Sequence, residues 1–146
     1  MFLKSIKQFF LKNKLQKILK KYPIVFAYVF GSFAKEKSGP LSDFDIAVFV
    51  DLKISEEKRD KIRFDIKDDI EKILRNADVV TLNNAEPFLE KEVVYNGKVL
   101  YTKDDNARKH YEADVIGRWL DWEWYDKQFI QSIKKNFGKP IKPYLY

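Results

Sequence analysis

The residues most suited to chemistry are a glycine–serine pair and two aspartates at fixed spacing. Gly31-Ser32 is followed by ten residues and then by Asp43-Phe44-Asp45. Side chains alternate along a strand, so Asp43 and Asp45 point the same way. Two like charges repel by roughly 4 kcal/mol at 4 Å and an effective dielectric constant of 20, so the pair needs a cation or a proton. Mg²⁺ prefers oxygen ligands and substrate phosphates, and the pattern suits a nucleoside triphosphate with its metal ions. The plainer alternative is an Asx-type turn that starts a strand.

Two apolar runs would position these residues. Residues 24–30 and 44–50 are rich in β-branched and aromatic residues, which predicts two buried strands. A helix opening at Ser32 would direct its free amide groups toward an anion, and Gly31 would let a phosphate approach the backbone. The connection over residues 35–42 contains Gly39-Pro40 and is expected to be a loop. The phosphate-binding P-loop pattern is absent, so that class of site is excluded.

The Gly-Ser, ten residues, Asp-x-Asp pattern resembles the signature of the nucleotidyltransferase superfamily related to DNA polymerase β. The short chain is similar to its minimal nucleotidyltransferase (MNT) branch, over roughly residues 24–103. Members carry a third carboxylate on a later strand, and Asp78 within residues 76–82 fits it. The resemblance implies an α+β fold, a small mixed sheet with helices packed on one face. Many relatives have arginine where this chain has Lys35, which offers charge to a phosphate but no bidentate fork.

The resemblance also implies roles for these residues. Asp43 and Asp45 would bind two Mg²⁺ ions bridging to the triphosphate of ATP, which is the substrate. Asp78 would ligate one metal ion and draw the proton from the acceptor hydroxyl as pyrophosphate leaves. The expected metal ligands and catalytic residues are therefore Asp43, Asp45 and Asp78. The expected nucleotide-binding residues are Gly31, Ser32, Lys35 and Ser42.

The acceptor is less evident from the residues. The minimal branch resembles antitoxins paired with HEPN RNase toxins, which implies transfer of AMP to a toxin tyrosine (AMPylation). The last expected helix has more aromatic surface than one helical face can bury, contributed by Trp119, Trp122, Trp124 and Tyr125. A tail that contains Pro and Gly follows it. This segment is the expected contact with a HEPN toxin. Two alternatives stay open, an antitoxin that acts by binding alone and a nucleotidyltransferase acting on a small molecule.

Composition bounds the remaining possibilities. A chain of 146 residues predicts one domain, here residues 1–146 with a basic helix 1–22 and an aromatic helix and tail 104–146. The net charge of +6 is uneven, because residues 1–22 hold seven lysines and no acid, whereas residues 23–130 hold 17 basic and 22 acidic residues. The body of the domain lacks the basic charge typical of a protein that grips nucleic acid, and no direct contact with nucleic acid is expected. Three alternatives stay open for the basic ends: RNA, an acidic partner, or solvent. Without cysteine or an apolar run of roughly 20 residues, the chain is expected to be cytoplasmic and not membrane-bound.

Periodicity predicts the other elements. Residues 2–22 form an amphipathic helix, broken near Asn13, that packs on the domain or binds a membrane surface. Ser55 starts a helix with an apolar stripe at residues 62, 66, 70 and 74. A helix over residues 87–95, a turn at Asn96-Gly97 and a strand over 98–101 follow, and the last helix runs from about 104 toward Phe129. The single histidine, His110, is expected at the surface, where no catalytic triad is available to it.

Overall fold

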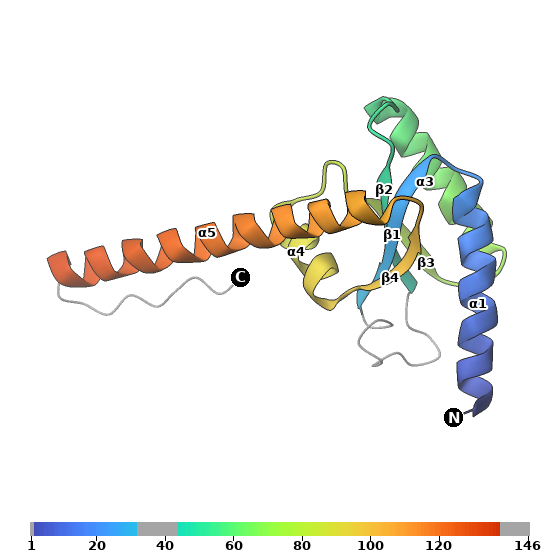
Figure 1. Cartoon of the computed structure of the whole chain (residues 1–146), viewed down its shortest axis with the longest axis horizontal. Coiled ribbons are helices and arrows are strands. Elements are labelled where there is room, and N and C mark those ends of the chain that lie inside the picture. The colour runs from blue at the N-terminus through green and yellow to red at the C-terminus, as the bar shows by residue number, and fades with distance from the viewer. Residues whose placement is uncertain (1, 32–43, 138–146) are drawn as a thin grey trace.

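The computed structural model describes residues 2–31 and 44–137. The elements, in chain order, are α1 (Phe2–Lys20), β1 (Ile24–Phe30), β2 (Phe44–Val50), α3 (Glu56–Glu71), β3 (Ala77–Thr81), α4 (Pro87–Asn96), β4 (Lys98–Thr102) and α5 (Asp105–Phe137) (Figure 1).

The four strands form one mixed sheet in the order β3-β2-β1-β4. Strand β1 pairs antiparallel with β2 and with β4, whereas β2 and β3 are parallel. Both central strands have the limits that their apolar runs predict, since strands buried on two faces need not alternate. The α+β class and the mixed sheet are therefore confirmed.

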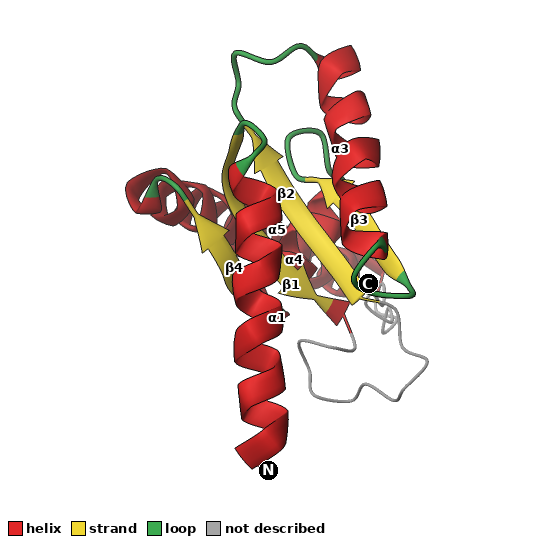
Figure 2. Cartoon of the chain, turned by 90° about the vertical axis from the view of Figure 1, so that its right-hand side faces the viewer, coloured by secondary structure: helices red, strands yellow, loops and turns green. Residues whose placement is uncertain are grey.

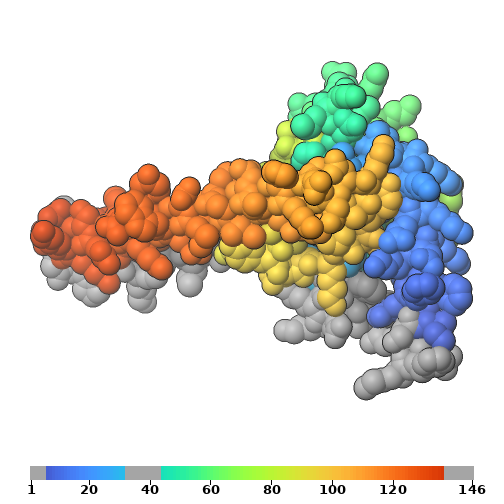
Figure 3. All heavy atoms as spheres, in the orientation of Figure 1, coloured from blue at the N-terminus to red at the C-terminus, as the bar shows by residue number. Residues whose placement is uncertain are grey.

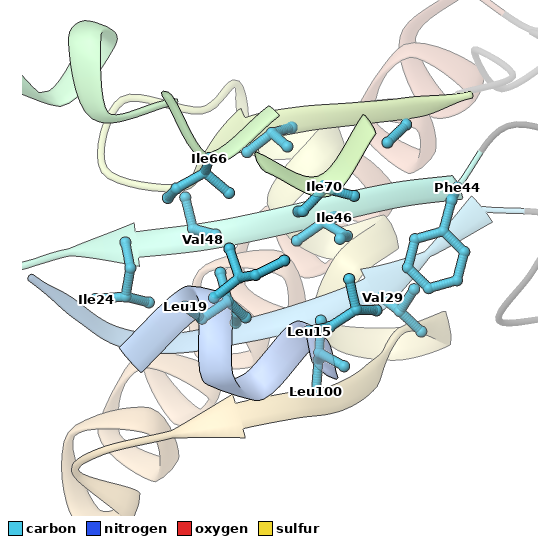
Figure 4. Packing of buried hydrophobic residues seen from close by; sticks show 14 of the residues in the cluster. Leu15, Leu19, Ile24, Val29, Phe44, Ile46, Val48, Ile66, Ile70 and Leu100 are labelled. Carbon is cyan, nitrogen blue, oxygen red and sulfur yellow. The ribbon is translucent and has the colours of Figure 1, made fainter. Parts of the chain in front are cut away.

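Helices α1 and α3 cover one face of the sheet (Figure 2). Leu15 and Leu19 of α1 and Ile66 and Ile70 of α3 are buried there. Figure 4 shows these side chains pointing toward strand residues such as Ile46. Full burial of each such side chain contributes roughly 1.5–3 kcal/mol, which makes this the main core. Helix α3 begins as its sequence predicts, because the Lys58 amide donates to the Ser55 side chain at 3.4 Å.

The opposite face of the sheet also carries helices. The sequence led us to expect helices on one face only, and α4 and α5 cover part of the other. Phe26 and Tyr28 of β1 are too large and apolar to face water, and they are buried in a second cluster. Val93 of α4 is buried in the same cluster, and Tyr111 of α5 packs against it. Helix α5 then continues well beyond the sheet as a projecting arm (Figures 1 and 3).

Three local expectations were wrong. Helix α1 is continuous through Asn13, because packing of the next turn, including buried Leu15, outweighs the low helix propensity of asparagine. Helix α5 reaches Phe137 instead of ending near Phe129. Gly97 forms no separate turn, since it caps α4 with extended backbone, φ −76° and ψ 164°, and leads directly into β4. Among the described residues, no helix is long and apolar enough to cross a membrane.

Candidate nucleotide and metal site

Two of the predicted carboxylates lie side by side at one end of the sheet. Asp45 on β2 and Asp78 on β3 are direct partners in the parallel register. Neighbouring strands lie about 4.8 Å apart, which places the two side chains within reach of a shared cation. Asp45 is partly exposed and Asp78 is exposed. The sequence predicted both residues for the site, and the fold brings them together across two strands that are 33 positions apart in the chain.

Alternation along the strands assigns these carboxylates to a definite face. Phe44 and Ile46 flank Asp45 and are buried in the core under α1 and α3. Ala77 and Val79 flank Asp78 and are buried in that same core. Asp45 and Asp78 consequently lie on the opposite face, which α4 and the start of α5 cover in part. The core behind them holds both strands in register.

Gly31 lies directly beside Asp45. Phe30, the last residue of β1, pairs with Asp45, so the chain leaves the sheet next to that carboxylate. Gly31 has φ +73°, in the left-handed region that favours glycine. A Cβ atom at this position would collide with Oδ2 of Asp45 and would lie 3.3 Å from its Cγ. Glycine is thus required both by the backbone and by the position of the carboxylate.

The other predicted site residues, Ser32, Lys35, Ser42 and Asp43, lie outside the described residues. Within residues 2–31 and 44–137, no group of three or more acids, histidines or cysteines could hold a metal ion. Of the three carboxylates that the sequence predicts for the site, the one outside the described residues is Asp43, two positions before Asp45. The Phe44 amide donates to the Asn76 carbonyl at 2.9 Å, so the pairing of the two chain segments extends to this end. The chemistry of the donors, carboxylate oxygens at one end of the sheet, fits Mg²⁺.

The sequence did not predict a set of buried polar contacts on the same face of the sheet. Glu90 of α4 is only 7% exposed. It accepts hydrogen bonds from the Tyr111 hydroxyl at 2.8 Å and from both terminal nitrogens of Arg118 at 3.2 Å. Burial raises the pKa of Tyr111, and its hydrogen bond to Glu90 raises it further. The hydrogen bonds to Glu90 also raise the pKa of Arg118. These contacts fix α5 against α4.

A second polar contact joins α5 to the centre of the sheet. The Tyr28 hydroxyl donates to Oε1 of Glu112 at 2.6 Å, and Arg108 donates to the same oxygen at 2.7 Å. Burial and this hydrogen bond raise the pKa of Tyr28, which stays protonated at neutral pH. The residues around Glu112 gave no indication of this contact, because Tyr28 lies 84 positions earlier in the chain. The first turns of α5 are therefore rigidly placed beside the carboxylate face.

The aromatic residues of α5 divide into a packed set and an exposed set. Trp119 is buried and donates from Nε1 to the Pro87 carbonyl at 3.1 Å. Beside it, a pocket of about 390 Å³ is lined by Pro87, Phe88, Arg118, Trp119 and Trp122. Further along the arm the large apolar side chains are exposed: Leu120, Trp124, Tyr125 and Phe129. The expected surplus of aromatic surface is confirmed.

His110 takes no part in the carboxylate site. It is exposed on α5, and its Nδ1 lies 2.7 Å from the Asn106 carbonyl of the preceding turn. A surface position is what the sequence predicted for it. The tail that follows α5, residues 138–146, lies outside the described residues.

Comparison with known proteins supports a family assignment. A family model described as polymerase beta, nucleotidyltransferase matches residues 13–106, which run from the second half of α1 through β4 and include Gly31, Asp45 and Asp78. No protein of curated function matches the sequence. The matched range ends at the first turn of α5, so the aromatic arm lies outside it.

Several solved structures share the fold. A chain in the crystal structure of a toxin-antitoxin complex with AMP-PNP aligns with a TM-score of 0.66 and 22% identity, over 84% of this chain and 97% of that chain. A chain in the tri-AMPylated Shewanella oneidensis HEPN toxin in complex with MNT antitoxin gives 0.63 and 22%, over 86% and 98%. A chain in the MntA-HepT toxin-antitoxin structure gives 0.61 and 21%, over 85% and 97%. At these identities the likeness establishes a common fold.

Proposed function

Because the chain belongs to the polymerase beta nucleotidyltransferase family, we propose that it transfers AMP from ATP to a hydroxyl group of a HEPN toxin and thereby acts as its antitoxin. The observation that carries this proposal is the pairing of Asp45 with Asp78 beside the left-handed turn at Gly31. The printed descriptions of the solved structures name AMP-PNP, an AMPylated HEPN toxin and an MNT antitoxin. Those properties belong to those complexes, and their shared fold supports the same reaction here.

The proposed reaction breaks a phosphoanhydride bond of ATP and forms a phosphate ester on the acceptor. The acceptor oxygen, expected to be that of a tyrosine, attacks the α-phosphorus of ATP and forms a new P–O bond. The bond from that phosphorus to the bridging oxygen of the β-phosphate breaks, and pyrophosphate leaves. Asp78 accepts the proton of the acceptor hydroxyl, which keeps charge in balance through the step. The acceptor gains one adenylyl group in each cycle.

Divalent metal ions complete the proposed site. Asp43, Asp45 and Asp78 would hold two Mg²⁺ ions, which supply charge stabilisation at the attacking and leaving oxygens. Asp45 and Asp78 lie on adjacent paired strands, which would hold both carboxylates in position before the nucleotide binds. Gly31 and Ser32 hold the phosphates, with Lys35 and Ser42 as further nucleotide contacts in this proposal. Gly31 allows close approach because it has no side chain.

The projecting arm is the proposed contact with the toxin. Trp124, Tyr125 and Phe129 are each more than half exposed, which is unusual for large aromatic side chains in the absence of a partner. Aromatic residues also dominate the energetics of protein interfaces. Replacing Trp124 by alanine should weaken toxin binding by more than 1 kcal/mol, measured by calorimetry, without changing ATP binding. Equal toxin affinity in the variant would refute this assignment of the interface.

Neutralisation by binding alone is the second candidate, and the exposed arm favours it as much as it favours catalysis. The two are separated by Asp45→Asn and Asp78→Asn, assayed for transfer from radiolabelled ATP and for toxin neutralisation. Catalysis predicts a loss of transfer of about a hundredfold or more, equivalent to about 3 kcal/mol, together with loss of neutralisation. Asp68→Asn, which changes an exposed aspartate on α3, is the matched control. Full neutralisation by the site variants would instead establish binding alone.

A further inference from the structure

A basic seam runs between α1 and the edge strand β4, on the face of the sheet opposite the carboxylates. It consists of two adjoining hollows. The larger, of about 730 Å³, is lined by Lys12, Asn13, Gln16, Lys17 and Lys20 of α1 and by residues 99–102 of β4. The smaller, of about 200 Å³, shares Lys12, Val99 and Leu100 with the larger one. The two hollows therefore form one continuous surface.

Three lysines line the larger hollow and make it basic. Lys12, Lys17 and Lys20 are exposed along α1, and none of the three forms an ion pair with a carboxylate among the described residues. The first and last of them are eight residues apart, which is about 12 Å along a helix. No acidic residue occurs between positions 1 and 22 to reduce their field. A row of lysines at this spacing suits a chain of phosphates better than a single anion.

The smaller hollow lies beside these lysines and is mostly apolar, although Gln8, Lys12 and Lys98 also line it. Its lining includes Leu11, Leu15, Val29 and Phe44. The wall is firmly held, because Gln16 Nε2 donates to the Leu100 carbonyl at 2.8 Å and joins α1 to β4. An acidic peptide would use the lysines but would have no need of an apolar cavity. A nucleotide unit presents a flat apolar base and a phosphate next to each other, and both find a matching surface here.

We infer that the seam between α1 and β4 binds a single strand of nucleic acid, with phosphates on Lys12, Lys17 and Lys20 and one base in the adjoining cavity. Composition alone shows only that basic residues concentrate at the chain ends, and it does not select RNA over an acidic partner or solvent as their contact. The fold gathers three of them along one groove. The seam lies across the sheet from Asp45 and Asp78, so strand binding and nucleotidyl transfer can be tested separately.

The test measures fluorescence anisotropy of a labelled 12-nucleotide RNA, and of a DNA of the same sequence, titrated with the full chain. Three phosphate contacts predict a slope of about −2 in the logarithm of affinity against the logarithm of salt, or a loss of about twentyfold between 50 and 200 mM. Lys12→Glu with Lys17→Glu should weaken binding about tenfold or more and flatten the slope. Lys127→Glu with Lys135→Glu, the same charge change on the distant arm, should have little effect.

A second variant tests the cavity without changing charge. Leu11→Trp fills the smaller hollow and should weaken RNA binding severalfold, while melting temperature and ATP binding report on its folding. The inference is overturned if the chain does not bind either strand at 50 mM salt, or if the two lysine double variants are equally affected. It is also overturned if oligoglutamate, or vesicles with anionic lipid, bind as tightly as RNA and are equally sensitive to Lys12 and Lys17. In those cases the seam recognises charge alone.

Discussion

Replacing Gly31 by alanine tests whether the turn after β1 positions the carboxylate site. The residue has φ +73°, where an L-amino acid costs about 1–2 kcal/mol relative to glycine. The added methyl group would also overlap Oδ2 of Asp45, so either the turn shifts or the carboxylate rotates away. We expect a destabilisation of about 2 kcal/mol, which for a chain of this size corresponds to about 4–8 °C in melting temperature. Displacement of Asp45 should also weaken binding of Mg·ATP about tenfold or more.

The matched control is Gly117→Ala in the middle of α5. A Cβ atom there meets nothing within 4 Å, and alanine favours a helix over glycine by about 0.5–1 kcal/mol. This variant should be slightly more stable than wild type and should bind the nucleotide equally well. Thermal unfolding and titration with a fluorescent ATP analogue in the presence of Mg²⁺ measure both quantities. Wild-type stability and affinity in Gly31→Ala would refute the role of this turn.

Two further predictions concern contacts that hold the helices in place. Glu90→Gln removes the buried charge that pairs with Arg118 and should lower the free energy of unfolding, measured by urea denaturation, by about 2 kcal/mol. Asp114→Asn changes the exposed partner of the same arginine and should lower it by under about 0.5 kcal/mol. Equal costs would contradict the importance of burial. Burial and a hydrogen bond to Asp69 raise the pKa of Tyr22 from 10.0 to about 12, so their stabilisation is complete below pH 10 and is lost as the pH rises through 12. Tyr22→Phe should therefore cost about 1 kcal/mol at pH 7 and less at pH 11, and a cost that is independent of pH over this range would refute the linkage.

The sequence was most informative where local pattern and chemistry coincide. Both central strands could be predicted to the residue, because each is an apolar run bounded by turn residues and interrupted only by Asp45 in β2. Asp78 could be assigned to the site only because residues 76–82 resemble a family pattern. That it neighbours Asp45 depends on the parallel pairing of β2 and β3, which no local signal specifies.

Long-range contacts account for what the sequence could not predict. Helix α1 passes through Asn13 because its next turn is packed on the sheet, and tertiary packing overrides a weak local preference. Glu90 has the sequence context of a surface glutamate, and only the fold brings Tyr111 and Arg118 to it. The lysines of α1 likewise form a groove only once β4 lies beside them.

The most direct test of the account is the intact mass of the proposed partner, a HEPN toxin to be sought among the proteins encoded beside this chain. The purified partner is incubated with the chain, ATP and Mg²⁺, and its mass is measured. We predict a gain equal to a whole number of adenylyl groups, absent when Asp45→Asn replaces the wild-type chain. An unchanged mass, with the partner still neutralised, would contradict nucleotidyl transfer as the function of the paired carboxylates.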